Sequence, residues 1–135
     1  MEQPLLSEKQ WDMLFNKSKD FVFVCRKTGD DYTYVYINPA ALEIFKENVI
    51  GKKISEIQSV ELTDLILKYY DMAIETKTQQ SFQDYTSFQS EVRKYETTVI
   101  PIIDNNNQHV LAITKEIAFE RDLQDKYLFM RSIFF

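Results

Sequence analysis

The order of strand-like and helix-like segments constrains the fold most. Two β-branched and aromatic runs, residues 21–26 and 32–37, flank a turn at residues 28–31 and predict a hairpin. Three more strand-like runs come late in the chain, at residues 81–88, 92–103 and 110–117. Helical patterns separate the two groups of strands. The sequence therefore predicts an α+β domain with antiparallel strands.

Helices are predicted at the centre and at the start of the chain. Ser59 can cap a long helix over residues 60–76, whose apolar residues recur at helical spacing. Asn38 followed by Pro39 marks the start of a shorter helix, since asparagine caps helices and proline suits the first turn. A capping-box pattern from Ser7 to Gln10 precedes an apolar face that includes Trp11 and Phe15.

The last segment, residues 118–135, is also predicted to be helical. Its apolar side chains recur three or four positions apart, close to a heptad repeat: Phe119, Leu123, Tyr127, Met130 and Phe134. The segment is too short to be stable alone. Its apolar end is expected to pack on a partner or to belong to a longer protein.

Composition excludes several classes of function. The 135 residues fit one domain, and the net charge of −5 argues against a nucleic-acid surface. Two glycines cannot build a phosphate-binding loop, and one cysteine with one histidine cannot form a zinc cage or an intrachain disulfide. No apolar stretch approaches the length of a membrane span, and the start does not read as a signal peptide. A cytoplasmic protein is the simplest interpretation.

No group of residues predicts catalysis. Asp30 and Asp31 lie in a turn, where they are expected to be solvated surface residues. A Ser/His/Asp catalytic triad is not expected, because the single histidine lies in a loop. The single histidine, His109, follows the asparagine-rich turn and is expected to be an exposed turn residue. The single cysteine, Cys25, lies on the first predicted strand and is expected to be a small buried hydrophobe.

Three stretches, in this order and spacing, resemble the PAS family of sensory modules in bacterial signalling proteins. The first is YINPAAL at residues 36–42, the second is VIGK at 49–52, and the third is YETTVIPIID at 95–104. The resemblance extends from about Trp11 to Leu123. Glu116 and Ala118 replace the Asp and Thr that are usual in the family, so the bonds between the last strand and the exit helix are expected to differ.

The resemblance implies a five-stranded antiparallel sheet with helices on one face and a ligand pocket between them. It divides the chain into a cap helix (1–20), a PAS core (21–117) and a C-terminal signalling helix (118–135). It also implies a regulatory function without catalysis. The output domain would follow in the same polypeptide, for example a histidine kinase, a diguanylate cyclase or a phosphodiesterase.

The pocket residues follow from the parity of the strands in the family, combined with strict alternation. This parity, with Ile66 added from the long helix, predicts an apolar, uncharged lining that carries several hydroxyl groups: Val22, Val24, Tyr34, Tyr36, Ile66, Tyr95, Thr97, Val99, Ala112 and Thr114. The ligand would be an uncharged small molecule. The alternative is that these rings only fill the core. A register error of one residue would invert the set.

No cofactor is predicted. The haem-binding histidine of the family lies on the long helix, and residues 60–76 contain no histidine. Blue-light flavin domains carry a reactive cysteine after the short helices, but residues 51–58 contain none, which excludes a covalent photoadduct. Flavin bound without a covalent bond stays open, although nothing argues for it.

Two other functions remain open. One is a dimerisation module without a ligand, in which the terminal helices form a homodimer. Its interface would comprise the apolar residues of these helices: Trp11, Phe15, Phe119, Leu123, Tyr127, Met130 and Phe134. The other is a stand-alone binding protein or enzyme with a different α+β fold.

Overall fold

A computed structural model describes residues 6–45, 47–88, 91–104 and 107–117. Its elements follow the predicted order, and the strand and helix positions predicted within these ranges are confirmed. In chain order they are α1 (Glu8–Phe15), β1 (Phe21–Thr28), β2 (Asp31–Ile37), α2 (Pro39–Phe45), α3 (Ile54–Ile57), α4 (Val60–Thr76), β3 (Gln80–Phe88), β4 (Glu91–Asp104) and β5 (Asn107–Ile117). The helix predicted over residues 118–135 lies outside the described residues.

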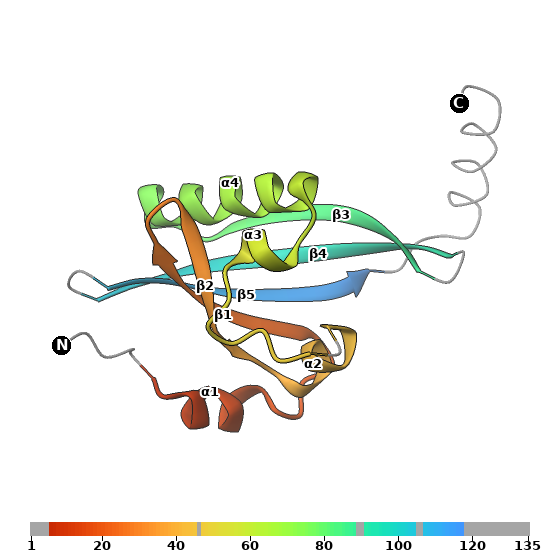
Figure 1. Ribbon diagram of the computed structural model, residues 1–135, viewed down its shortest axis with the longest axis horizontal. Coiled ribbons are helices and arrows are strands. Elements are labelled where there is room, and N and C mark those ends of the chain that lie inside the picture. The colour runs from red at the N-terminus through yellow and green to blue at the C-terminus, as the bar shows by residue number, and fades with distance from the viewer. Residues whose placement is uncertain (1–5, 46, 89–90, 105–106, 118–135) are drawn as a thin grey trace.

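The five strands form one antiparallel sheet in the order β2-β1-β5-β4-β3 (Figure 1). The last strand in sequence, β5, is therefore the central strand, and β2 and β3 are the edges. This is the predicted α+β architecture. β5 pairs with β1 over residues 109–114 and with β4 along its whole length, so its last three residues are held by β4 alone.

Capping residues set the ends of the helices as the sequence predicts. The Ser7 hydroxyl accepts a hydrogen bond from the backbone of Gln10, and the Gln10 side chain accepts one from the backbone of Ser7. Ser59 accepts from the backbone N–H of Leu62 at 3.2 Å and so caps α4. At its other end α4 stops at Lys77, which adopts a left-handed conformation with φ of 56°.

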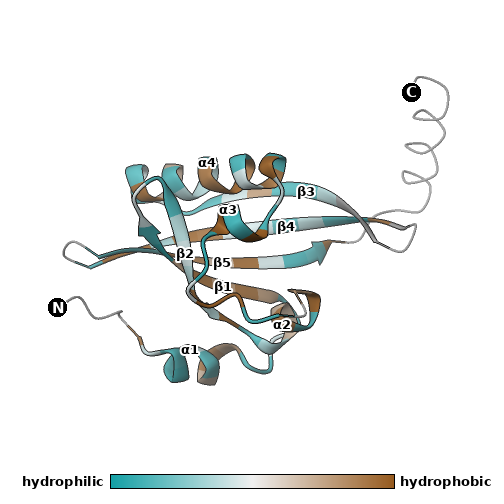
Figure 2. Ribbon diagram, in the orientation of Figure 1, coloured by the Kyte–Doolittle hydropathy of each residue, from teal (hydrophilic) through white to brown (hydrophobic). Residues whose placement is uncertain are grey.

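Helices pack against both faces of the sheet. The inner face carries Phe23, Cys25, Val99 and Ala112 and packs against α3 and α4. The outer face carries Val22, Val24, Tyr36 and Leu111 and packs against Trp11 of α1. Figure 2 shows the alternating hydrophobic and hydrophilic bands of α4 that are expected when one side of a helix covers a core.

Asn38 joins the two faces at the end of β2. The Asn38 side chain is fully buried and forms four hydrogen bonds. Its Oδ1 accepts from the backbone N–H groups of Val22 (3.0 Å) and Ala41 (3.1 Å). Its Nδ2 donates to the carbonyl oxygens of Asp20 (2.8 Å) and Phe15 (3.3 Å). The predicted helix cap thus also fixes the start of β1 and the end of α1.

Candidate functional site

The inner face brings together the predicted residues of the last two strands. Val99 and Thr97 of β4 pair directly with Ala112 and Thr114 of β5. The hydroxyl groups of Thr97 and Thr114 lie 2.7 Å apart and form a hydrogen bond across the strands. Two more predicted residues belong to this side, because Tyr95 precedes Thr97 by two positions and Ile66 of α4 packs against the inner cluster.

The predicted set does not share one face, however, and the prediction was wrong for three residues. Val22 and Val24 of β1 and Tyr36 of β2 lie in the outer cluster against α1. The parity assumed for β1 was shifted by one residue. The inner residues of β1 are Phe21, Phe23 and Cys25, since Phe21 pairs with Thr114 and Phe23 with Ala112.

A β-bulge explains why Tyr34 and Tyr36 separate. Val24 pairs with Tyr36, but the next residue of β1, Cys25, pairs with Tyr34. Val35 is therefore an extra residue in β2, and the alternation of its side chains breaks there. As a result Tyr34 packs in the inner cluster and Tyr36 in the outer one. Alternation counted along the sequence cannot detect such an insertion.

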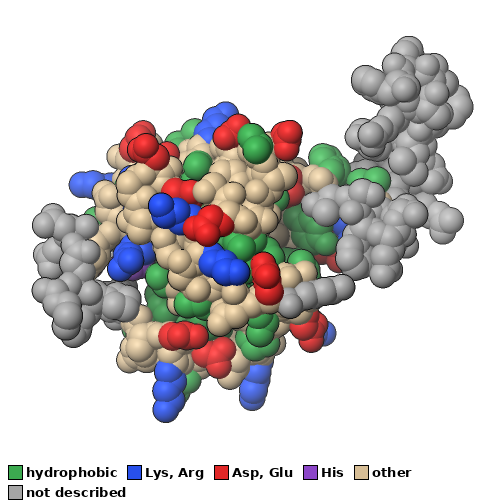
Figure 3. Space-filling model, viewed as in Figure 1, with side chains coloured by type: hydrophobic (Ala, Val, Ile, Leu, Met, Phe, Trp, Pro, Cys, Tyr) green, Lys and Arg blue, Asp and Glu red, His purple; other side chains and the backbone are tan. Residues whose placement is uncertain are grey.

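Aromatic rings gather on the inner face beside the hydroxyl pair. Phe23, Tyr34 and Phe45 are mutual neighbours, with ring centroids 5.7 to 6.2 Å apart. Phe21 and Tyr95 form a second pair at 6.0 Å. Of these five, only Tyr34 is fully buried, whereas the others are partly exposed. Figure 3 shows hydrophobic side chains reaching the surface between the α4 side and the α2 side of the molecule.

The polar groups around Tyr34 and the Thr97–Thr114 pair are uncharged. Burial is the main reason that the pKa of the Tyr34 hydroxyl lies well above its ordinary value, and the hydrogen bond from Gln58, at 3.3 Å, only partly offsets it. Burial also raises the pKa of the Cys25 thiol and of the Tyr70 hydroxyl. This part of the inner face thus offers hydroxyl and amide groups, whereas the charged Asp84 and Glu116 lie farther along the face, opposite Tyr95 on its two neighbouring strands.

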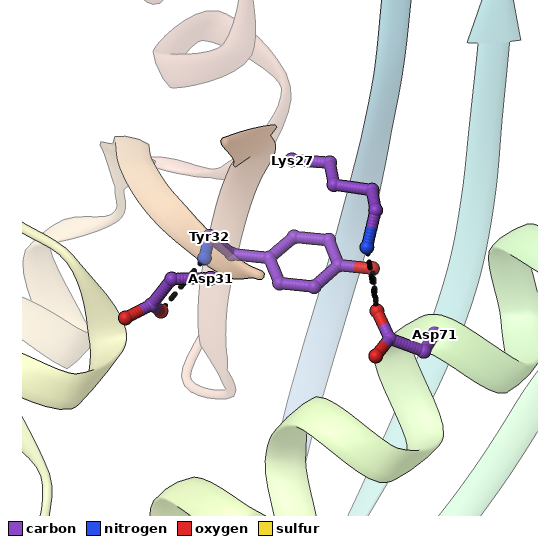
Figure 4. A network of polar contacts seen from close by, with 4 residues as sticks. All are labelled: Lys27, Asp31, Tyr32 and Asp71. Atoms are coloured by element: carbon purple, nitrogen blue, oxygen red, sulfur yellow. Dashed lines mark hydrogen bonds and ion pairs between the residues drawn. The ribbon is translucent and has the colours of Figure 1, made fainter. Parts of the chain in front are cut away.

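A separate polar network joins the β1–β2 hairpin to α4 (Figure 4). The Asp71 carboxylate of α4 accepts a hydrogen bond from the buried Tyr32 hydroxyl at 2.8 Å. It also forms an ion pair with the Lys27 ammonium group at 2.9 Å. Asp31 accepts from the backbone N–H of Tyr32 at 2.7 Å. Burial, followed by the bond to Asp71, raises the pKa of Tyr32, so this hydroxyl stays a donor.

We expect Tyr32→Phe to lower the free energy of unfolding by about 1 kcal/mol, because a bond from a buried donor to a carboxylate is lost. We expect Lys27→Met to cost less than about 0.5 kcal/mol, since both partners of this ion pair are partly exposed. Urea unfolding of the two variants measures the difference. Equal losses would contradict this ranking.

Two of the residues predicted for a dimer interface, Trp11 and Phe15, belong to the part of the chain that the structure describes. Trp11 is 6% exposed and packs with Phe15 on the outer face of its own sheet, where the Tyr36 hydroxyl also donates to Asp12 at 3.0 Å. On the same helix, Met13 and Leu14 are exposed instead. The other predicted interface residues, Phe119, Leu123, Tyr127, Met130 and Phe134, lie outside the described residues. Their role in dimerisation stays a prediction.

His109 corrects another expectation. It lies within β5, is buried, and pairs with Arg26 of β1 and Ile102 of β4. The expected exposed turn position is wrong because β5 begins at Asn107, two residues earlier than His109. Sequence reasoning also missed Phe21, Phe23, Phe45 and Gln58 as inner-face residues. Only the pairing between β1 and β5 reveals the parity of the first two.

No helix among the described residues has both the length and the apolar character needed to cross a membrane. The chain is similar in fold to several solved structures. The PAS domain of BvgS from Bordetella pertussis has a TM-score of 0.68 at 16% identity, over 92% of this chain and 96% of that chain. A sensory box sensor histidine kinase from Vibrio cholerae has a TM-score of 0.58 at 19% identity, over 82% and 87%.

The VqmA dimer structure, also from Vibrio cholerae, has a TM-score of 0.64 at 18% identity, over 84% of this chain and 52% of that chain. No curated protein matched the chain. The model of the PAS fold family matches residues 15–122, which is most of the sequence and includes the whole sheet. A stand-alone protein of a different α+β fold is therefore the wrong interpretation, and the chain belongs to the PAS fold family.

Proposed function

We propose that this chain is the regulatory sensor module of a bacterial, cytoplasmic signal-transduction protein. An uncharged small molecule would bind on the inner face, and the signal would pass through the sheet to residues 118–135. A histidine kinase, a diguanylate cyclase or a phosphodiesterase in the same polypeptide would be the output domain. The observation that carries the proposal is the inner face itself, where neutral hydroxyl groups lie beside partly exposed aromatic rings.

The chemistry of this face favours an uncharged ligand. Tyr34, Thr97 and Thr114 can donate or accept hydrogen bonds, but none of them can balance a charge. A charged ligand held by these three groups would lose its hydration without gaining a counter-ion from them, which costs several kcal/mol. Phe21, Phe23 and Tyr95 add apolar surface. A small molecule with an aromatic or aliphatic body and one or two polar atoms would suit these groups.

The strand β5 offers a direct route for the signal. Thr114, which takes part in the hydroxyl pair, lies three residues before Ile117, the last residue of β5. Ile117 pairs with Lys94, so the last residue of β5 is held against β4. A ligand that rearranges the Thr97–Thr114 pair would favour one packing of this end over another. Such a shift is limited by the difference in ligand affinity between the two packings.

Native mass spectrometry of the purified chain, with an absorption spectrum taken alongside, tests the ligand. We expect a mass above 16.1 kDa that disappears on denaturation. In the Thr97→Val/Thr114→Val double variant, the amount of bound ligand should fall about tenfold or more. The reason is that the hydroxyl groups that would bind the polar atoms of the ligand are gone.

The chain offers a matched control for that variant. Thr28 and Thr33 form a similar hydroxyl pair, 3.0 Å apart, in the β1–β2 hairpin. The Thr28→Val/Thr33→Val variant should keep the ligand. A chain that carries no small molecule and binds none from a library of uncharged compounds would refute the sensor function.

The second candidate function is a homodimerisation module that needs no ligand. It is favoured by the exposed apolar side chains of Met13 (72%) and Leu14 (63%) on α1. In this case the terminal helices would form the dimer, and charged residues at Leu123 and Met130 should convert it to a monomer. Sedimentation velocity measures this change. A dimer that survives both substitutions would rule the candidate out.

A further inference from the structure

The Tyr34 hydroxyl is a buried donor whose proton is unused. Tyr34 of β2 is only 3% exposed, and its hydroxyl oxygen accepts a hydrogen bond from Nε2 of Gln58 at 3.3 Å. In the part of the chain that the structure describes, no group accepts a hydrogen bond from this hydroxyl in return. A buried donor without an acceptor lowers stability, because the bond that it makes with water in the unfolded chain is lost. The hydroxyl can therefore form a further bond, as a donor.

Gln58 binds the Tyr34 oxygen from the junction of α3 and α4. Its backbone N–H donates to the carbonyl oxygen of Ile54 at 2.9 Å, and its own carbonyl oxygen accepts from the Thr63 hydroxyl at 3.5 Å. The backbone of Gln58 is thus held while its amide points at Tyr34. If the amide turned over, it would accept the Tyr34 proton but leave its own N–H groups as unused donors. The pair has a surplus donor in either orientation.

The proton remains on Tyr34 at neutral pH. Burial and, next, the neighbouring Cys25 thiol raise the pKa of Tyr34 well above its ordinary value, and the bond from Gln58 offsets only part of this. Asp31 adds a smaller increase of the pKa. The hydroxyl is therefore a donor over the whole physiological range, and its need for an acceptor does not depend on pH there.

The surroundings of Tyr34 are apolar. The rings of Phe23 and Phe45 lie beside that of Tyr34, with centroids 6.2 Å and 6.1 Å from it. Phe45 of α2 and Ile57 of α3 are only partly buried, so this side of the inner cluster is near the surface. A buried water needs about three polar partners, and the two rings offer none. An acceptor on a bound molecule would satisfy the hydroxyl better than a trapped water.

Other hydroxyl groups of the inner face are already satisfied. The Tyr32 hydroxyl, two positions earlier in β2, donates to Asp71 at 2.8 Å (Figure 4). The Thr97–Thr114 pair shares one hydrogen bond and has one proton left over, but Thr114 is partly exposed, so solvent can accept that proton. Of these groups, it is Tyr34 that combines nearly complete burial with an unused proton.

We propose that Tyr34 determines the specificity of the proposed ligand site, and that the ligand presents a hydrogen-bond acceptor to its hydroxyl group. This inference rests on the proposed function, because it names the class of ligand for the same inner face. A neutral ketone or ester with an apolar body has the required chemistry. Its carbonyl oxygen accepts the Tyr34 proton, and its body packs on Phe23 and Phe45. An alcohol of the same shape is less suitable, since its own proton would be buried without an acceptor.

Matched pairs of neutral probes test this preference in the full chain. Each pair compares a ketone with the alkene that has a CH2 group in place of the carbonyl oxygen, and acetophenone with isopropenylbenzene is the smallest pair. NMR titration of the isotope-labelled protein gives both dissociation constants. We expect the ketone to bind at least about tenfold more tightly, because a hydrogen-bonding site discriminates against a ligand that lacks the bonding atom. In Tyr34→Phe the two constants should agree within about threefold, since the donor is gone.

Two further variants separate the unused proton from the tyrosine ring itself. In Gln58→Glu the carboxylate would accept the Tyr34 proton, so the preference for the ketone should disappear although the hydroxyl is still present. Tyr32→Phe is the matched control on the same strand, because the Tyr32 proton is already bound to Asp71, and it should keep the preference. Circular dichroism checks that all three variants fold.

The outcomes distinguish this inference from the proposed function. A preference below about threefold in the wild type, or one that Tyr34→Phe and Gln58→Glu leave unchanged, would overturn the role of Tyr34 while the ligand site stands. The same holds if no ketone binds but other uncharged compounds do. If no compound of either kind binds, the proposed function fails and the inference fails with it.

Discussion

Replacing Asn38 by alanine is expected to lower the free energy of unfolding by about 3 to 5 kcal/mol. The substitution removes four hydrogen bonds and leaves the buried backbone N–H of Val22 and the carbonyl oxygen of Asp20 without this partner. Each such bond contributes about 1 kcal/mol, and one of the four is the cap of α2, from the Ala41 N–H. This is a large part of the stability of an ordinary domain, which is about 5 to 15 kcal/mol. Urea unfolding followed by circular dichroism measures the change.

Two other variants separate the causes. Asn38→Asp keeps an acceptor for Val22 and Ala41 but replaces the Nδ2 donor by an oxygen, which faces the carbonyl oxygens of Asp20 and Phe15. This variant should therefore also lower the free energy of unfolding. Asn48→Ala removes one bond at an exposed turn, where Oδ1 accepts from Ile50, and should cost less than about 1 kcal/mol. If Asn38→Ala cost no more than this control, the junction would not depend on Asn38.

Replacing Trp11 by alanine is expected to detach α1 from the sheet, at a cost of about 3 kcal/mol. Trp11 is the buried residue of α1, and it packs with Val22, Val24 and Tyr36. A helix of eight residues is not stable in water without such packing. The amide hydrogens of α1 should then exchange about 100-fold faster, while those of β4 and β5 change much less. Hydrogen exchange measured by mass spectrometry resolves both regions.

Leu14→Ala is the matched control on the same helix. Leu14 is 63% exposed, and alanine favours helices slightly more than leucine does. The exchange of α1 should therefore stay within about threefold of the wild type. Rapid exchange in both variants would show that the length of the helix, and not the packing of Trp11, limits its stability.

The two faces of the sheet have different roles in this arrangement. The outer cluster holds α1 through Trp11 and through the Tyr36–Asp12 bond. The inner face carries the neutral hydroxyl groups and the partly exposed rings of the proposed ligand site. Asn38 connects them, since its side chain bonds to the end of α1, the start of β1 and the start of α2.

Local chemistry was sufficient to predict the elements. The Ser7–Gln10 capping box, the Ser59 cap and the Asn38-Pro39 start depend on residues three or fewer positions apart, and the structure contains all three. The hairpin and the last three strands follow in the same way from short β-branched and aromatic runs. The order of these segments, together with the three PAS-like stretches, was enough to indicate the fold. Each of these signals is contained in a short window of sequence.

Much of the site was decided only in the tertiary structure. The parity of β4 and β5 was predicted correctly as a pair, and Thr97 meets Thr114. The parity of β1 was predicted wrongly. A strand that is covered on both faces is apolar on both, so its sequence does not alternate between polar and apolar residues. The bulge at Val35 then separated Tyr34 from Tyr36, although both are buried tyrosines two positions apart.

The sequence by itself thus determined which segments form helices and strands and in which order, since caps, turns and side-chain periodicity act over a few residues. The tertiary structure alone decided which side chains meet. Phe23 pairs with Ala112, which comes 89 positions later in the chain, and His109 is buried between β1 and β4. The physical reason is that the face a strand presents depends on its register with distant strands, and one inserted residue reverses that face.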